Sequence, residues 1–111
     1  MIKLRREQVL ALIKAASGPF IRRLAEDLRE IFPERFAELG PAGARAAIES
    51  GIEKGRTYGM TRENEVAQLV GLMFELGLEF DKDPDFQWAH RILCDSTRSP
   101  QERLDELYRL A

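Results

Sequence analysis

Two groups of side chains in the C-terminal half of the sequence have residue types and spacings that could support catalysis or the binding of a cation. His90 and Cys94 stand four residues apart, so a helix would place the imidazole and the thiol on one face. A catalytic cysteine also needs an oxyanion site and a group that orients the histidine, and no neighbouring motif indicates either. The sequence therefore favours a structural interpretation, with Cys94 as a small core residue and His90 partly exposed.

The second group consists of alternating carboxylates, Asp81, Asp83 and Asp85, which is how a calcium-binding loop begins. Such a loop needs glycine at its sixth position and a bidentate glutamate at its twelfth, where this sequence has Phe86 and Ile92. We expect these aspartates to cap a helix and to meet solvent rather than to bind a cation.

Other reactive motifs are missing from the sequence. It contains no glycine-rich phosphate loop, no nucleophile elbow and no paired-histidine metal motif. A single cysteine excludes an intramolecular disulfide, and with a single histidine it leaves too few ligands for a closed zinc site. We predict that the protein is not an enzyme and that it binds neither a cofactor nor a metal.

Composition and charge exclude several classes of partner. The 17 basic and 19 acidic residues are interleaved, which argues against nucleic acid, whose binding needs a concentrated basic face. No apolar run approaches the roughly 18 residues of a membrane span, and the charged N-terminus lacks the apolar core of a secretory signal. We predict a cytoplasmic protein without membrane contact, and the sequence leaves its oligomeric state open.

The elements that position these groups are predicted from helical periodicity. In the first part of the chain, apolar residues recur at helical spacing before and after Ser17-Gly18-Pro19, where we predict a kink or a break. The stripe before this point contains Val9, Leu12, Ile13 and Ala16, and the stripe after it contains Phe20, Leu24, Leu28, Ile31 and Phe32. The two pieces share one buried face.

The middle of the chain is predicted to hold a helix with an unusually small apolar stripe. Pro33 ends the preceding helix, and Gly40-Pro41 is the clearest break before a helix over residues 42–58. Along one side of that helix, residues without bulky side chains recur at every fourth position: Gly43, Ala47, Gly51, Gly55 and Gly59. This ridge predicts close packing against another helix within the core.

Three further helices are expected after this one. Thr61 is a predicted N-cap of a central helix, and Asp83-Pro84 begins the next helix after a loop from Gly77 to Asp83. A capping box, Ser99-Pro100-Gln101-Glu102, begins the last helix. The predicted fold is an all-α single domain over residues 1–111, a bundle of five to six short helices.

The sequence pattern from Gly51 to Leu93 resembles that of a known protein family. Its parts are a glycine-bearing helix followed by Tyr58-Gly59-Met60-Thr61, a hydrophobic helix that ends in Leu76-Gly77, Phe80-Asp81-Lys82-Asp83-Pro84, and Trp88-Ala89 before Ile92-Leu93. These features resemble a family of small helical proteins encoded among bacterial type VI secretion genes, beside spike, adaptor and effector genes. The resemblance covers roughly the last two thirds of the chain and transfers no catalytic residue.

The resemblance implies a cytoplasmic accessory that binds an effector or its adaptor and helps it to mature or load. Two alternatives remain open at this point. One is an immunity protein that neutralises a neighbouring toxin, and the other is a hydrolase that uses His90, Cys94 or the aspartate loop.

An aromatic-rich segment predicts where a protein partner would bind: Phe80, Asp81, Asp83, Asp85, Phe86 and Trp88. The same aromatic residues, together with Tyr58, could instead hold the loop against the core, with Asp83 as a helix cap.

Overall fold

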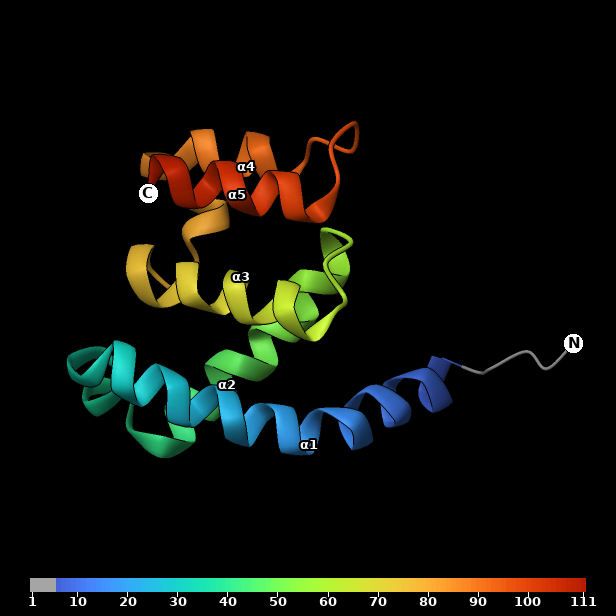
Figure 1. Cartoon of the computed structure of the whole chain (residues 1–111), viewed down its shortest axis with the longest axis vertical. Helices are drawn as coiled ribbons and strands as arrows, with labels where there is room; N and C mark the ends of the chain where they lie inside the picture. The colour runs from blue at the N-terminus through green and yellow to red at the C-terminus, as the bar shows by residue number, and fades with distance from the viewer. Residues whose placement is uncertain (1–5) are drawn as a thin grey trace, which may run out of the picture.

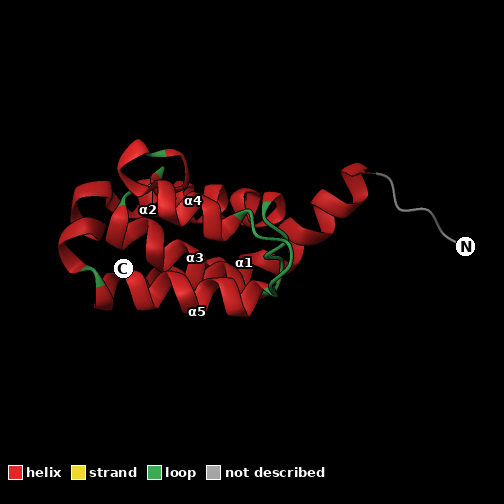
Figure 2. Cartoon of the chain, turned by 90° about the horizontal axis from the view of Figure 1, so that it is seen from above, coloured by secondary structure: helices red, strands yellow, loops and turns green. Residues whose placement is uncertain are grey.

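Five α-helices and two short 3-10 helices build the protein, for which a computed structural model describes residues 6–111 and, from residue 18 onward, the side chains. In chain order they are α1 (Arg6–Ile31), α2 (Pro33–Thr57), α3 (Glu63–Leu76), η1 (Phe80–Lys82), η2 (Pro84–Phe86), α4 (Gln87–Leu93) and α5 (Pro100–Leu110). No strand occurs in the described part of the chain (Figure 2), so the predicted all-α class is confirmed.

The helices are arranged with α3 at the centre, between the pair α1 and α2 on one side and the pair α4 and α5 on the other (Figure 1). Its apolar residues are almost completely buried, namely Val66, Leu69, Val70, Leu72, Met73 and Phe74. The prediction of a central helix in this part of the sequence is therefore confirmed.

α1 passes through Pro19 without ending, so the predicted break at Ser17-Gly18-Pro19 is wrong. Pro19 lies on the exposed side of the helix, where the lost backbone hydrogen bond is not shielded from water. The residues that follow bury one continuous face, with Phe20, Leu24 and Leu28 between 2% and 7% exposed. The side chains of the earlier stripe, from Val9 to Ala16, lie outside the described residues.

Two of the predicted breaks in the first half of the chain are confirmed, although the second interrupts a helix rather than ending it. α1 ends at Ile31, and Pro33 begins α2. Gly40 has φ 72° and ψ 168°, a left-handed φ that glycine adopts without strain, and it divides α2 into a short first segment and a long second one. Residues 34–39 belong to that first segment.

Three of the five small residues in the predicted row, Ala47, Gly51 and Gly55, are buried in the core as predicted, whereas Gly43 is half-buried and Gly59 is exposed beyond the end of α2. A Cβ atom on Gly51 would lie 2.4 Å from Cγ2 of Val70, and one on Gly55 would lie 2.3 Å from the carbonyl oxygen of Met60. A Cβ atom at either point would overlap a neighbour, so the backbone of α2 lies directly against the Val70 side chain of α3 at Gly51 and against the backbone of the residue 59–60 turn at Gly55.

The predicted starts of α3 and α5 are correct to within one residue. α3 begins one residue later than predicted, because the N–H of Arg62, not Thr61, donates to Oε1 of Glu65 at 3.1 Å. At α5 the predicted capping box is confirmed: Glu102 N donates to Ser99 Oγ at 3.1 Å, and Ser99 N donates to Glu102 Oε1 at 3.0 Å.

Candidate functional site

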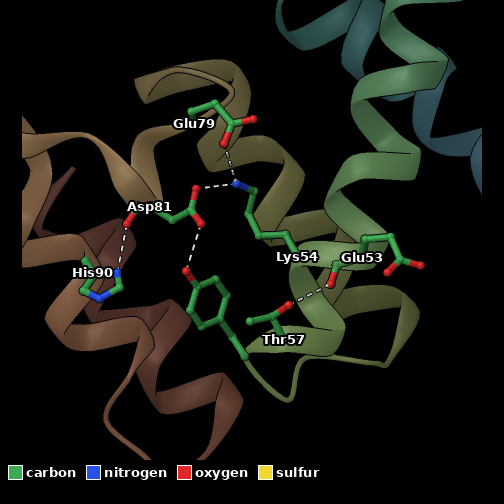
Figure 3. Close-up of polar contacts among 7 residues, drawn as sticks. Glu53, Lys54, Thr57, Glu79, Asp81 and His90 are labelled. Atoms are coloured by element: carbon green, nitrogen blue, oxygen red, sulfur yellow. Dashed lines mark hydrogen bonds and ion pairs between the residues drawn. The ribbon is translucent and has the colours of Figure 1, made fainter.

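Asp81 is the residue through which the predicted partner-binding segment is joined to the bundle. Its side chain, in η1, is 2% exposed, and its Oδ1 forms an ion pair with Nζ of Lys54. The hydroxyl of Tyr58 donates to Oδ2 at 2.8 Å. Figure 3 shows Lys54 reaching from α2 to the loop that follows α3. One carboxylate therefore binds a lysine and a tyrosine on the same helix.

Lys54 and Tyr58 can share this carboxylate because they are four residues apart, Lys54 in the last turn of α2 and Tyr58 at its C-cap. The Lys54 side chain is 7% exposed, and besides Asp81 it approaches Oε2 of Glu79 at 3.7 Å. Glu79 is mostly exposed, so its contribution is screened by solvent. The buried charge of Lys54 is compensated chiefly by Asp81.

The pKa values of the acidic partners follow from this pairing. Burial alone would raise the pKa of Asp81, but hydrogen bonds from Lys54 and Tyr58, together with the charge of Lys54, hold it below its ordinary value. Burial and the neighbouring Asp81 carboxylate raise the pKa of Tyr58. At neutral pH the site therefore holds a carboxylate and a protonated phenol, which suits a structural link.

The backbone of Asp81 makes a further connection, to α4. Nδ1 of His90 lies 2.9 Å from the carbonyl oxygen of Asp81, which can only accept, so Nδ1 carries the proton. In the neutral ring Nε2 is then an acceptor, and it lies 3.5 Å from Sγ of Cys94. The sequence did not reveal this orienting group for the histidine.

Cys94 is exposed, so its prediction as a core residue is wrong. It follows the last residue of α4, where the helix ends and the side chain turns to the surface rather than inward. Its own N–H, the usual kind of oxyanion donor in thiol enzymes, donates to the carbonyl oxygen of His90 at 3.0 Å. The thiol and imidazole are adjacent, but the amide beside the thiol is already engaged.

The predicted partner-binding residues divide into an interior and a surface group. Phe80 and Asp81 are 0% and 1% exposed, so they support the segment from inside and present no side-chain surface to a partner. Asp83 accepts from the N–H of Asp85 at 2.9 Å and so caps η2, as predicted for a helix start. Asp85 itself is exposed.

Phe86 and Trp88 form the aromatic part of the surface group. Their ring centroids are 6.3 Å apart and their planes are inclined by 81°, the favourable edge-to-face geometry. Both side chains are partly buried against the core and partly open to solvent. The structure thus brings four of the six predicted residues to one surface, and we call these four, Asp83, Asp85, Phe86 and Trp88, the loop surface.

A hollow of about 390 Å³ lies beside the loop surface, between the 3-10 turns and α4. Its lining carries both signs of charge: Lys82 and Arg91 are basic, and Asp83 is acidic. His90 of α4 also lines it. A smaller hollow of about 260 Å³ adjoins the Lys54–Asp81 pair. In Figure 3 Glu53 and Thr57 stand near this pair, and Thr57 Oγ1 donates to the carbonyl oxygen of Glu53 at 3.3 Å.

Sequence reasoning missed Lys54 and Tyr58 as parts of the site. A signal was available, since Lys54 lies three residues after Gly51 and four before Tyr58, beside a ridge predicted to be buried. A lysine in that position must find a counter-charge, but the pattern does not say which of the chain's 19 acidic residues supplies it.

Among the described residues, no group of three or more His, Cys, Asp or Glu side chains could hold a metal ion. No helix of that part of the chain is long and apolar enough to cross a membrane. Comparisons with models of protein families, with curated proteins and with solved structures gave no match. The assignment of function therefore depends on the geometry of the loop surface and its supports.

Proposed function

We propose that the protein is a non-enzymatic, cytoplasmic accessory that binds another protein through the loop surface. The observation that carries this proposal is the Phe86–Trp88 pair, two partly open aromatic rings on a segment whose base is fixed by Asp81. Aromatic anchors of this type contribute most of the energy at many protein interfaces.

The support beneath the loop surface favours binding because it limits the entropy lost on association. Asp81 fastens the segment to α2 through its carboxylate and to α4 through its carbonyl oxygen. Phe80 adds a completely buried ring next to it. A segment held in this way need not become ordered when a partner binds.

The charges around the loop surface favour a protein as the partner rather than a nucleic acid or a lipid surface. Lys82 and Arg91 are interspersed with Asp83 and Asp85, so no single sign of charge dominates. Mixed polar residues around an aromatic centre are the usual composition of a protein interface, whereas a polyanion needs a concentrated basic face. With the sequence resemblance, this supports a type VI secretion effector, or its adaptor, as the partner.

The test is co-expression with the effector or adaptor encoded beside this gene, followed by co-purification. Phe86→Ala should weaken the complex by about 2 kcal/mol or more if the ring is an anchor. Asp85→Lys should also weaken it, mainly by slowing association. Asp85 is preferred to Asp81 for this charge reversal because a charge at position 81 would disrupt the buried pair.

Ile31→Ala is the matched control. Ile31 is a large apolar residue, 67% exposed, at the end of α1 and outside the loop surface, so its truncation should leave the complex intact. Each variant must first show the parental helical circular dichroism. Equal binding by parental protein, Phe86→Ala and Asp85→Lys would remove the loop surface from the interface.

The alternatives predict different results in the same system. An immunity protein would protect cells from a neighbouring toxin, so its deletion would poison the producing cell. An accessory would instead be needed for effector delivery, without self-poisoning. A hydrolase that uses Cys94 as its nucleophile would lose its activity in Cys94→Ser, whereas the proposed binding function should survive that substitution.

A further inference from the structure

A hollow with a buried cation in its wall lies at the opposite end of α4 from the loop surface. Its volume is about 740 Å³, and it is bounded by the end of α2, the end of α4 and the segment that leads into α5. Arg103 of α5 contributes to its lining and is 6% exposed. A guanidinium so deeply buried must have compensating partners.

Part of the guanidinium is satisfied by helix ends. Nη1 donates to the carbonyl oxygen of Tyr58 at 2.9 Å and to that of Leu93 at 2.6 Å. Tyr58 is the C-cap of α2 and Leu93 is the last residue of α4, so one nitrogen closes the C-terminal ends of two helices. Both hydrogens of Nη1 are thereby used.

The other terminal nitrogen of the guanidinium, Nη2, has no hydrogen-bond partner among the described residues and is not fully enclosed. Nε also lacks a partner there, but it is completely buried and cannot meet a ligand. Within the same part of the chain, Arg103 forms no ion pair with any carboxylate. The buried cation thus leaves one N–H group, at Nη2, open to an anion.

The wall of the hollow next to Nη2 is a glycine. A Cβ atom on Gly59 would lie 3.9 Å from Nη2, and Gly59 has φ 75°, a conformation that other residues rarely adopt. The backbone therefore leaves space beside Nη2. Arg98 adds a second cation to the lining, and the one hydrogen bond of its side chain to the described residues, from Nη2 to the carbonyl oxygen of Glu102, is long at 3.4 Å.

We propose that this hollow binds the oxyanion of a small molecule, a carboxylate or a phosphate, on Nη2 of Arg103. Arg98 supports the negative charge at the rim, and the exposed Ser96 hydroxyl lies in the same lining. The Asp95 carboxylate in this segment is engaged by Thr97, whose N–H donates to Oδ1 at 3.1 Å. The site does not share a residue with the loop surface, and so it is independent of the proposed partner.

Cys94 provides the readout for a test, because it is the only cysteine, it is exposed, and it lines the same hollow. Its rate of reaction with iodoacetamide, an uncharged reagent, would be measured with inorganic phosphate and, separately, with benzoate. Sodium chloride at equal ionic strength is the reference, so that screening is constant. We expect at least one of the two anions to slow labelling several-fold and to raise the melting temperature. The anion that protects identifies the phosphate or the carboxylate as the preferred group.

A pair of substitutions at Ser96 distinguishes binding of the anion in the hollow from a non-specific effect of the added salt on the labelling of Cys94. Ser96 is exposed and makes no side-chain hydrogen bond to the described residues, so Ser96→Asp and Ser96→Asn should both fold normally. A carboxylate at position 96 should compete with the ligand and abolish protection, while the isosteric amide should preserve it. Arg103 itself is left intact because it also closes α2 and α4. Unchanged labelling and melting of the parental protein with both anions would overturn the proposal, as would equal protection in the two Ser96 variants.

Discussion

Helix α2 and its C-cap contact α3 and the segments that follow α2 and α3 along two neighbouring strips that are built on opposite principles. Along one strip, Gly51 and Gly55 have no side chains, and the Val70 side chain of α3 and the backbone of the residue 59–60 turn pack directly against them. Along the other, Lys54 and Tyr58 extend long polar side chains to a single buried carboxylate, Asp81. The first contact depends on shape and the second on the pairing of charge.

The two strips should therefore fail in opposite ways. The shape-dependent contact tolerates no added atom, because the space at each glycine is already filled by a neighbour. The charge-dependent contact tolerates no lost partner, because removing one ion leaves the other buried and uncompensated. Substitutions that add atoms and substitutions that remove charge can test each strip separately.

The largest expected effect comes from Lys54→Ala. It leaves the Asp81 carboxylate, 2% exposed, without its counter-ion, and we expect a loss of about 3–5 kcal/mol in the free energy of unfolding. Urea denaturation followed by circular dichroism measures this loss.

The control for this variant is the double replacement Lys54→Met with Asp81→Leu, which removes both charges at similar volume. It should recover much of the stability lost by Lys54→Ala, since apolar substitutes for a buried pair are often neutral or stabilising. A double variant as unstable as Lys54→Ala would show that the pair's hydrogen bonds, not its charges, determine the stability of this strip.

The next largest effect is expected at Gly55. Gly55→Ala would place its Cβ against the carbonyl oxygen of Met60, whose N–H donates to Gly55 O at 2.6 Å, so the turn itself must move. We expect a loss of about 1–3 kcal/mol. Gly51→Ala meets side-chain atoms of Val70 and Met73, which can shift more easily, and should be milder. Thermal melting of both variants checks this order, and the reverse order would contradict the backbone argument.

A smaller and more specific effect is expected in the pH dependence of stability. The pKa of Asp81 is held below its ordinary value of 3.8, so its contribution is present above that pH and is lost as the pH falls through the folded-state pKa. Unfolding free energies measured from neutral pH to below 3.8 should therefore fall in acid. Asp81→Asn should flatten this acid slope, and Gly51→Ala should leave it unchanged. Parallel slopes in all three proteins would show that other carboxylates cause the acid loss.

The smallest expected effect is at Gly18, which separates helix propensity from packing. A Cβ there would meet nothing within 4 Å, and the residue lies inside α1. Gly18→Ala should therefore stabilise the protein by about 0.5–1 kcal/mol, the intrinsic gain of alanine in a helix. The same gain in helix propensity offsets part of the loss of stability in Gly51→Ala and Gly55→Ala. The cost of the steric clash in each variant is therefore its measured loss plus this gain. A Gly18→Ala variant that melts below the parental protein would contradict the open surroundings of this position.

The sequence by itself determined the class of fold and most of the helix boundaries. The periodic apolar stripes predicted the helices, and Pro33, Gly40 and Ser99 marked breaks and caps that the structure contains. These signals are local, because a cap or a breaker acts on groups within a few residues of itself. At Pro19 the same local reasoning was wrong, because the burial of Phe20, Leu24 and Leu28 on one face outweighs a single lost hydrogen bond.

Only the tertiary structure decided which polar residues meet. Lys54 and Asp81 are 27 positions apart, and Arg103 reaches Tyr58 across 45 positions, separations on which a helical pattern carries no information. The structure likewise divided the predicted binding residues, placing Phe80 and Asp81 inside and Phe86 and Trp88 at the surface. The periodicity of a helix specifies which residues share a face, but the packing of helices against one another selects the partner across the contact, because a buried charge must find a counter-ion or hydrogen-bonding groups there.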